Sequence, residues 1–458
     1  MTTEPQASTD LAAATGAGGD SAGGDSAEQT TVGNYFVSNY PPYAYWDTAR
    51  VNEAHAAIAK PPRPGNPLGV YLHIPFCRKR CHFCYFRVYT DKKNDEIQGY
   101  LDAALAELAL YAKQPAIVGR KAQFVYFGGG TPSFLSPEQL VALTDGMKRE
   151  VSWEGAEEVT FECEPGTLTD RKIRTIRDIG VTRLSLGVEN FDDHILESNG
   201  RAHLSAQIQR AYDYARSCEF PQVNIDLIAG MMNETEDNWR ANIVKTIAMA
   251  PDSVTIYQME VPYNTTIYKQ MKAEGKITAP VADWQTKRRW VAEAFAALEA
   301  AGYAVKSAYT AVRNPSKTSF VYRDSLWAGA DLLSLGVASF GHLNGVHYQN
   351  EHDFAPYVDR VKKGELPIHR ALTPDNDERL IREFILQMKL GHLDTSYFTK
   401  KFGTDPLVRF KPQLDDLVSQ KLAEIDGARL TLTRGALLEV DRLLHAFFLP
   451  KHAGARYA

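Results

Sequence analysis

The sequence predicts an α/β protein with a parallel β-sheet, followed by a mainly helical C-terminal region. Three observations predict this fold class. Short apolar runs alternate with amphipathic helices between about 68 and 310, six such β/α units can be distinguished, and the pattern after about 373 is mainly helical. Strands joined in this way form a parallel sheet with right-handed crossovers. Six units are two short of a closed eightfold barrel.

Each β/α unit has its own sequence signals. The predicted strands are 69–74, 123–127, 158–162, 182–188, 222–228 and 252–259. The predicted helices are 95–113, 137–149, 169–179, 203–217, 236–249 and 284–301. The first helix places Ile97, Leu101 and Leu108 on one face. The second begins with Ser136-Pro137-Glu138-Gln139, a capping box with proline at the first helical position.

The composition divides the chain into five segments. Residues 1–32 are a low-complexity, Gly/Ala/Ser-rich tail that we expect to be disordered. Residues 33–67 form an N-terminal arm with six aromatic residues between 34 and 46, which we expect to pack on the main domain or over its active site. The core follows at 68–310, then a connecting segment at 311–372 with a small-residue loop at 335–341, and a C-terminal helical domain at 373–458.

Length and charge limit the function classes. A chain of 458 residues with 44% apolar residues suggests two or three domains with a large core. A net charge of −5 without a basic stripe gives no reason to expect a nucleic-acid partner. No apolar run is long enough for a transmembrane helix, and the first 30 residues do not resemble a secretory signal. Five cysteines, three of them clustered, fit metal ligation in a reducing compartment, so we expect a cytoplasmic protein.

The most specific motif is the C-x3-C-x2-C run of Cys77, Cys81 and Cys84, which has no fourth cysteine nearby. Three thiolates on a [4Fe–4S] cluster leave one iron open to a small molecule, whereas a cluster that only carries electrons usually has four. A zinc site with His82 as its fourth ligand is the alternative. It would require four groups on one tight loop to converge tetrahedrally. Cys163 and Cys218 are expected to be small buried hydrophobes.

Candidate ligand-binding residues recur at the ends of the predicted strands, where parallel α/β folds collect their ligands. The glycine run 128–130 follows the second strand, and its lack of side chains permits close backbone approach to a ligand. A carboxylate or an arginine accompanies each of the next four strands. These residues are Glu162, Glu189, Arg201, Asp226 and Glu260.

The cysteine motif and its flank from Tyr71 to Cys77 resemble the radical S-adenosylmethionine (SAM) superfamily. Within it they resemble the oxygen-independent coproporphyrinogen III oxidases and their relatives. The resemblance implies an open, curved six-stranded barrel with a [4Fe–4S] cluster on Cys77, Cys81 and Cys84. SAM would bind the open iron and be split by one electron into methionine and a 5′-deoxyadenosyl radical. The C-terminal domain would be winged-helix-like, with a plain helical cap as the alternative.

The same resemblance implies roles for individual residues. The loop with Gly129, Gly130 and Thr131 would hold the SAM amino group, and Glu162 would bind its ribose or amine. Tyr71 and Glu162 are the candidates for catalytic roles. The loop at 336–341, which contains Phe340, would help to hold a second SAM. The full set of expected cofactor contacts is Tyr71, His73, Phe83, Gly129, Gly130, Thr131, Glu162, Glu189, Arg201, Asp226, Glu260 and Phe340.

Three positions depart from the oxidase pattern. Phe86 stands where the oxidases often carry a fourth cysteine, Glu189 replaces a glutamine, and Glu260 replaces a small residue. Three readings therefore remain: a coproporphyrinogen oxidase that turns propionates into vinyl groups, a radical SAM methyltransferase or cyclopropane-forming enzyme, and a heme-binding chaperone. As an oxidase the protein would be a monomer that acts on a porphyrinogen and receives electrons from a flavodoxin or ferredoxin.

Overall fold

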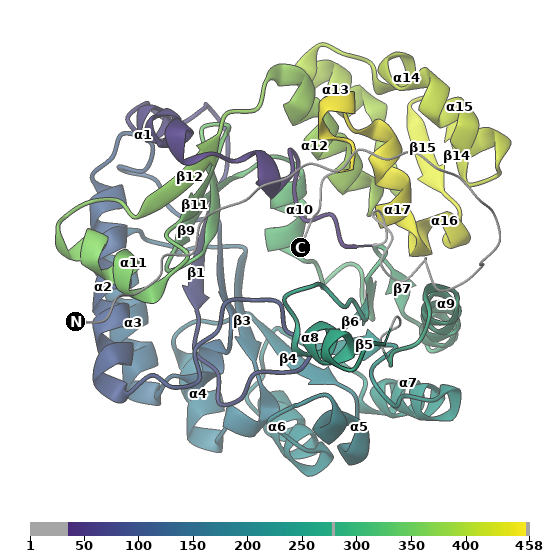
Figure 1. The fold of residues 1–458 in the computed structure, drawn as a ribbon, viewed down its shortest axis with the longest axis horizontal. Coiled ribbons are helices and arrows are strands. Elements are labelled where there is room, and N and C mark those ends of the chain that lie inside the picture. The colour runs from purple at the N-terminus through teal and green to yellow at the C-terminus, as the bar shows by residue number, and fades with distance from the viewer. Residues whose placement is uncertain (1–34, 277–279, 455–458) are drawn as a thin grey trace, which may run out of the picture.

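The computed structural model describes residues 35–276 and 280–454, and a 12-stranded sheet forms its centre (Figure 1). The strand order is β12-β11-β10-β9-β1-β2-β3-β4-β5-β6-β8-β7. The low-complexity tail expected at 1–32 lies outside the described residues. Helices α2, α3, α4, α6 and α7 lie along the outer side of the curved sheet, and the C-terminal region sits at one end of it.

The six predicted strands all exist, and each bound differs from its prediction by two residues or fewer. They are β1 (Leu68–Ile74), β2 (Phe124–Gly129), β3 (Glu158–Cys163), β4 (Arg183–Glu189), β5 (Gln222–Ala229) and β6 (Ser253–Gln258). They pair in chain order and all run parallel. The α/β fold class is confirmed, and the carboxyl ends of the six strands meet at one end of the sheet.

The six predicted helices connect these strands. They are α2 (Asn94–Ala112), α3 (Pro137–Glu150), α4 (Asp170–Asp178), α6 (Ser205–Ser217), α7 (Glu236–Met249) and α9 (Trp284–Ala300). Two short helices, α5 (Asp193–Ser198) and α8 (Thr266–Ala273), accompany them. The predicted capping box begins α3, because Ser136 Oγ accepts from the Gln139 N–H at 3.1 Å and Gln139 Oε1 accepts from the Ser136 N–H at 3.0 Å.

The sheet extends beyond the six predicted strands at both edges. At one edge β9 (Asp331–Leu335) pairs parallel to β1, so the sheet has a seventh parallel strand. Antiparallel β10 (Phe340–Leu343), β11 (Val346–Asn350) and β12 (Ile368–Leu372) follow β9. At the other edge β8 (Thr310–Val312) and β7 (Ala304–Val305) follow β6. The connecting segment is therefore part of the sheet.

The aromatic arm joins several parts of the molecule. It leads into α1 (Val51–Ile58), which lies against β12, and the Asp47–Ala371 bridge pairs the arm with β12. Val37 and Tyr40 are buried in the apolar core of the C-terminal region. The arm thus packs on the main sheet, as expected, but it also completes the C-terminal core.

The C-terminal region is mainly helical, as predicted. Its helices are α12 (Asn376–Met388), α13 (Thr395–Phe402), α14 (Pro406–Arg409), α15 (Lys411–Ser419), α16 (Arg434–Leu438) and α17 (Val440–Leu444). Two earlier helices, α10 (Val321–Trp327) and α11 (Phe354–Lys362), lie in the connecting segment. A three-stranded antiparallel sheet of β13 (His392–Asp394), β15 (Arg429–Leu432) and β14 (Ala423–Asp426) accompanies them. Among the described residues, no helix has the length and apolar character needed to cross a membrane.

Candidate functional site

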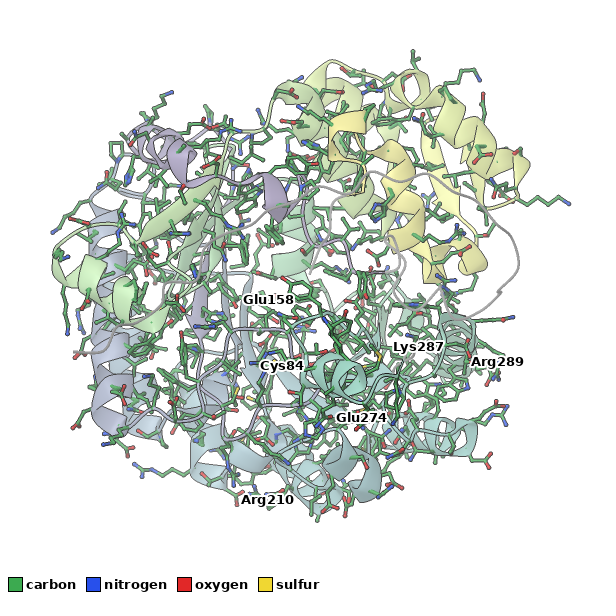
Figure 2. All side chains as sticks on the ribbon, in the orientation of Figure 1. Cys84, Glu158, Arg210, Glu274, Lys287 and Arg289 are labelled. Carbon is green, nitrogen blue, oxygen red and sulfur yellow. The ribbon has the colours of Figure 1, made fainter. Side chains whose placement is uncertain are left out.

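A cavity of about 460 Å³, here called the barrel cavity, lies inside the curved sheet. It is lined by twelve of the residues singled out from the sequence: Cys77, Cys81, Cys84, Phe83, Gly129, Gly130, Thr131, Glu162, Glu189, Arg201, Asp226 and Glu260. Figure 2 labels Cys84 near the middle of the view. Glu158, at the start of β3, accepts from the Val321 N–H of α10 at 2.9 Å at the opposite end of the strand. The residues predicted at the strand ends therefore line one cavity, although they come from six separate segments of the chain.

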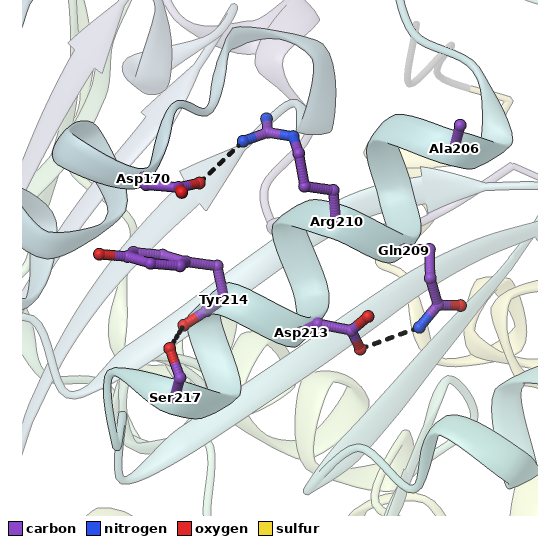
Figure 3. Close-up of a pocket in the computed structure, with 7 residues that line it drawn as sticks. All are labelled: Asp170, Ala206, Gln209, Arg210, Asp213, Tyr214 and Ser217. Carbon is purple, nitrogen blue, oxygen red and sulfur yellow. Dashed lines mark hydrogen bonds and ion pairs between the residues drawn. The ribbon is translucent and has the colours of Figure 1, made fainter.

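A second hollow lies on the outer face of α6 and has a different character (Figure 3). Its polar side chains bond one another: Arg210 pairs with Asp170 at 2.9 Å and Gln209 donates to Asp213 at 2.9 Å. Asp170, Arg210 and Asp213 are exposed, Gln209 is half-buried, and none of the lining residues is a cysteine. We therefore place the functional site in the barrel cavity.

The cysteine sulfurs have hydrogen-bond donors directed at them. Thr131 Oγ1 donates to Cys77 Sγ at 3.3 Å, and Arg201 Nη1 donates to Cys81 Sγ at 3.2 Å. Burial raises the pKa of Cys77 to about 12 and that of Cys84 to about 11. Such thiols lose their protons only when a cation binds them. Donors to sulfur and a nearby positive charge fit a negatively charged iron–sulfur cluster.

His82 does not complete a zinc site. Its Nδ1 lies 3.0 Å from the Ser198 carbonyl oxygen, and its ring packs so closely on Gly200 that a Cβ there would lie 2.7 Å from it. The ring is therefore held against the loop before Arg201. Among the described residues, Glu351, His352 and His369 form the one group of three ligand atoms that all lie within 4.8 Å. The three cysteines are not in such a group, and a single tetrahedral zinc ion would need its ligand atoms that close together.

The glycine loop is fixed by close contact with β1. Gly129 has φ +115°, and a Cβ there would lie 2.5 Å from His73 Nδ1. A Cβ on Gly130 would lie 2.9 Å from the Ile74 carbonyl oxygen and 3.1 Å from Cys77 Sγ. Glycine is therefore required where this loop passes the cysteine loop.

Glu162 ties the glycine loop to the cavity wall. It accepts hydrogen bonds from Tyr126 Oη at 2.6 Å and from the Gly129 N–H at 3.1 Å. Burial raises its pKa to about 7, and the nearby charge of Asp226 adds to the effect, while the Tyr126 hydrogen bond opposes it. A buried carboxylate of this kind can accept hydrogen bonds from a polar or cationic ligand.

Glu189 and Arg201 form a second polar group at the end of β4. The strand is irregular between Gly187 and Glu189, and Glu189 has φ +65°. Arg201 Nη2 donates to the Gly187 carbonyl at 2.7 Å and lies 3.5 Å from Glu189 Oε1. Burial raises the pKa of Glu189 to about 7, although the Arg201 charge lowers it. On β5, Asp226 accepts from Ser185 Oγ at 2.8 Å, and burial raises its pKa.

Tyr71, His73 and Phe340 are not among the residues that line the barrel cavity, and their contact with a cofactor stays a prediction. Tyr71 Oη and His73 Nδ1 lie 3.1 Å apart behind the glycine loop, where Gly129 covers the histidine ring. Phe340 packs on the arm, with its ring 4.2 Å from that of Tyr43. The Tyr71 ring lies 5.9 Å from that of Tyr126 and 6.5 Å from that of Tyr322.

Glu260 has a partner that the sequence did not indicate. Its Oε1 accepts from the Phe36 N–H of the arm at 2.6 Å, and burial raises its pKa to about 7. Asp441 of α17 accepts from the Val37 N–H at 2.8 Å and pairs with Lys389 at 2.7 Å. Phe36 and Asp441 line the cavity. They come from opposite ends of the chain, so no local motif could have revealed them.

Arg183 was also missed. It lines the barrel cavity with only 2% of its surface exposed, and its guanidinium lies 4.1 Å from the Phe320 ring centre. It lies at the start of β4, whereas the predicted ligand-binding residues were those at the carboxyl ends of the strands. The alternation of Arg183, Ser185, Gly187 and Glu189 along one face of β4 could have revealed it.

Comparisons with known proteins agree with this site. Residues 71–243 match the family model described as the radical SAM superfamily. The chain is 25% identical over 384 residues to the heme chaperone HemW of Bacillus subtilis, covering 82% of this chain and 98% of that protein. It is 28% identical over 392 residues to the oxygen-independent coproporphyrinogen III oxidase of Helicobacter pylori (strain ATCC 700392 / 26695), covering 81% and 84%.

A solved structure gives the same result for the fold. The coproporphyrinogen III oxidase HemN from Escherichia coli superimposes with a TM-score of 0.78 at 22% identity, covering 90% of this chain and 96% of that one. A radical SAM domain implies a [4Fe–4S] cluster and SAM as cofactors, and the donor set around Cys77, Cys81 and Cys84 fits both. Residues 71–243 therefore match the radical SAM superfamily, and over most of its length the chain is similar to both coproporphyrinogen III oxidases and heme chaperones.

Proposed function

We propose that the protein is a radical SAM enzyme that decarboxylates propionate side chains of a porphyrinogen to vinyl groups, as an oxygen-independent coproporphyrinogen III oxidase does. The barrel cavity carries the proposal, because it gathers three cysteines and the polar groups of four strand ends in one space. The likeness of the fold to HemN over 90% of the chain supports it.

In this proposal the chain's own residues hold and orient the cofactors. Cys77, Cys81 and Cys84 would hold the cluster, with Arg201 and Thr131 donating to its sulfur ligands. The glycine loop and Glu162 would bind the amino group and ribose of SAM. Glu189 and Asp226 would add acceptors beside it, which suits a molecule with a sulfonium and an ammonium group.

The remaining cavity wall suits a large substrate built from pyrrole rings. Aromatic side chains from the arm, the cysteine loop and the barrel line it: Phe36, Tyr85, Phe86, Tyr126, Tyr257, Tyr309 and Phe320. The rings of Tyr85 and Phe86 lie 4.6 Å apart, and Phe86 is 47% exposed. Aromatic faces stack on planar rings and are typical of ligand sites. Phe86 would thus supply a substrate contact at the position of the oxidases' fourth cysteine.

The bound cofactors would supply a 5′-deoxyadenosyl radical that removes one hydrogen atom from the propionate side chain. Loss of CO2 and of one electron to an acceptor then leaves the vinyl group, and two propionates react in turn. The protein must therefore exclude water from the cavity while the radical exists. Phe36, held by Glu260, and Tyr309 cover it on the side of the C-terminal region.

A heme chaperone is the second candidate. The similarity to HemW of Bacillus subtilis extends over 98% of that protein, and Glu189 and Glu260 depart from the oxidase pattern. A chaperone would use the same aromatic cavity to hold heme without turnover.

One anaerobic incubation separates the candidates. Reconstituted protein is mixed with SAM, dithionite, an electron acceptor and coproporphyrinogen III, and products are identified by chromatography and mass spectrometry. The proposal predicts protoporphyrinogen together with two molecules of 5′-deoxyadenosine per macrocycle, and no product from Cys81→Ala. Stable heme binding without turnover would support the chaperone. Formation of S-adenosylhomocysteine would indicate methyl transfer, and either result contradicts the proposal.

A further inference from the structure

Two histidines and a glutamate meet at the edge of the main sheet where β11, β12 and α11 lie together (Figure 1). Glu351 and His352 directly follow β11, and His369 belongs to β12, the last strand at that edge. One possible ligand atom from each of the three lies within 4.8 Å of the other two. None of the three residues lines the barrel cavity, so this group is separate from the site described above.

A β-bulge sets the position of His369. The pairs on either side of the bulge are Gln349 with Arg370 and Asn350 with Ile368. His369 is therefore an extra residue in β12, with no residue opposite it in β11. A bulge bends its strand and redirects a side chain, and bulges are over-represented at sheet edges and next to active sites. The backbone thus departs from regular pairing at the residue that meets the end of β11.

The spacing of the side chains suits the ligands of one metal ion. His369 Nδ1 lies 3.2 Å from Glu351 Oε2, and the ring centres of His352 and His369 are 5.1 Å apart. Two nitrogen or oxygen ligands at about 2.0–2.2 Å from a tetrahedral zinc ion lie about 3.3–3.6 Å from each other. The Glu351–His369 pair is close to this spacing, and His352 is near enough to supply a third ligand.

The group is both accessible and supported by its neighbours. The exposed fraction of the side chain rises from 14% for Glu351 to 32% for His369 and 56% for His352, so an ion can enter from solvent. Arg360 Nη1 donates to Glu351 Oε1 at 2.9 Å, which turns Oε2 toward His369. His352 Nε2 lies 3.2 Å from Asp353 Oδ2. Metal-binding histidines commonly have a carboxylate at the second ring nitrogen, and metal-binding carboxylates are themselves hydrogen-bonded.

We propose that Glu351, His352 and His369 bind one divalent transition-metal ion of the Zn²⁺ type, with water as the fourth ligand. Two imidazoles and a carboxylate suit zinc and its neighbours in the first transition series, whereas Mg²⁺ and Ca²⁺ prefer oxygen ligands throughout. The bound ion would join the end of β11 to β12. It would also be linked to the loop after the cysteines, because Asp353 pairs with Arg87.

The test uses zinc on the full-length, reconstituted protein. The protein is incubated anaerobically with Zn²⁺ and desalted, and its zinc and iron are counted by plasma mass spectrometry. X-ray absorption at the zinc edge then identifies the ligand atoms, since nitrogen and oxygen ligands lie at about 2.0–2.2 Å from zinc and sulfur ligands at about 2.3 Å. This difference separates the proposed site from zinc held by the three cysteines.

The variant for this test is His352→Ala/His369→Ala. The matched control is His194→Ala, because His194 is an exposed histidine of α5 that belongs to no group of three ligand atoms within the described residues. If the double variant does not fold, His352→Ala takes its place, because more than half of the His352 side chain is exposed. Calorimetry gives the zinc affinity of each protein.

We expect one zinc ion per chain, with nitrogen and oxygen ligands alone, in the wild type and in His194→Ala. Zinc affinity should fall at least ~10-fold when the histidines are removed, while the iron content stays the same. Mg²⁺ in ~100-fold excess should not displace the zinc. Wild-type protein that retains no zinc, a ligand shell of sulfur, or undiminished zinc binding by the histidine variant would overturn the site. None of these results depends on SAM cleavage, so they leave the test of the proposed function separate.

Discussion

Arg201 connects the cysteine loop to the barrel. Its guanidinium donates to Cys81 Sγ at 3.2 Å and to the Gly187 carbonyl at 2.7 Å, and Glu189 lies 3.5 Å away. Only 9% of its side chain is exposed. The planar fork of arginine can reach a sulfur and a carbonyl at once, which a lysine ammonium does not do as well. Arg201 therefore contacts Cys81, one of the three predicted cluster ligands, directly.

Arg201→Met should weaken the cluster. A hydrogen bond to a charged group contributes about 1.5–3 kcal/mol, and the variant leaves the Cys81 thiolate without it. We expect iron bound per protein after reconstitution to fall below about half of the wild-type value, and Arg201→Lys to restore part of the loss through its charge. Iron is measured colorimetrically against protein. Full iron content in Arg201→Met would show that the contact does not support the cluster.

Individual site residues were largely predictable because strand ends are a local property of the sequence. Glu162, Glu189 and Asp226 each end or lie near the end of an apolar run, so a pattern of period two locates them. His73 also follows this pattern, yet Gly129 of the glycine loop lies directly against its ring. Whether a side chain at a strand end reaches the cavity depends on how the neighbouring loop packs. The alternation of apolar and polar residues along the strand does not reveal that packing.

The loop between β9 and β10 is held from α2. The Tyr100 hydroxyl donates to the His73 carbonyl at 2.7 Å and accepts from the Val337 N–H at 3.1 Å. Glu107 accepts from the Gly336 N–H at 2.9 Å. The small-residue loop singled out from the sequence therefore joins α2 to the end of β1, next to the cysteine loop.

Gly336→Ala should destabilise the protein through this contact. Gly336 has φ +97°, and a Cβ there would lie 2.3 Å from the Tyr100 hydroxyl and 2.9 Å from the His73 carbonyl oxygen. The left-handed backbone costs about 1–2 kcal/mol, and the overlap adds about 1–3 kcal/mol. Gly119→Ala is the matched control, because Gly119 has φ +75° with open space around it. Equal losses in urea unfolding would contradict the close contact.

Glu107 should make stability depend on pH. It is fully buried, and burial raises its pKa to about 7, although hydrogen bonds from Tyr357, Gly336 and Asn350 oppose the shift. Since the pKa is near 4.3 in the unfolded chain, its contribution to stability is complete below about pH 4 and is lost as pH rises through 7. The free energy of unfolding of the wild type minus that of Glu107→Gln should therefore decrease by up to about 3 kcal/mol between pH 5 and 8. A difference independent of pH would contradict the raised pKa.

The β/α units were predictable as elements, and the sheet edges were not. Each predicted strand is followed by a long amphipathic helix. The spacing of apolar residues therefore changes clearly between the two-residue repeat of a strand and the 3.6-residue repeat of a helix. Strand β9 has only five residues, all buried, and it pairs with β1 although it comes from the connecting segment. Short buried strands without alternation give no signal of their own, and their pairing is decided by tertiary contact.

At the scale of the whole molecule, one buried charge network joins three regions. Lys389 of the C-terminal region is fully buried, pairs with Asp441 at 2.7 Å and donates to the Val37 carbonyl of the arm at 2.7 Å. Tyr309, at the edge of the barrel, also donates to Asp441. The arm, the barrel and the C-terminal region thus meet at Asp441 beside the cavity. Burial lowers the pKa of Lys389, and the Asp441 charge opposes that change.

Asp441→Ala should unfold the protein much more easily. Removing one partner of a buried ion pair typically costs about 3–5 kcal/mol, because the other charge stays buried without compensation. The double variant Asp441→Leu/Lys389→Met removes both charges and should recover most of that loss. Urea unfolding followed by tryptophan fluorescence measures both. A small effect of Asp441→Ala, or a double variant no better than the single one, would show that the network does not hold the regions together.

The arrangement of the whole molecule was predictable only where the resemblance to a known family implied it. Composition indicated several domains, and the resemblance implied the barrel with its helical C-terminal domain. The burial of Val37 and Tyr40 in the C-terminal core joins residues about 400 positions apart. Contacts of this range arise from the final packing, so neither propensity nor periodicity predicts them.

The central claim is that three cysteines hold a cluster whose open iron binds SAM inside the barrel cavity. Its most direct test measures 5′-deoxyadenosine formed from SAM and dithionite by reconstituted wild-type protein and by Cys81→Ala. The account predicts cleavage by the wild type, together with cluster absorbance near ~400 nm, and loss of both in the variant. SAM cleavage that survives in Cys81→Ala, or that is absent from iron-loaded wild-type protein, would contradict it.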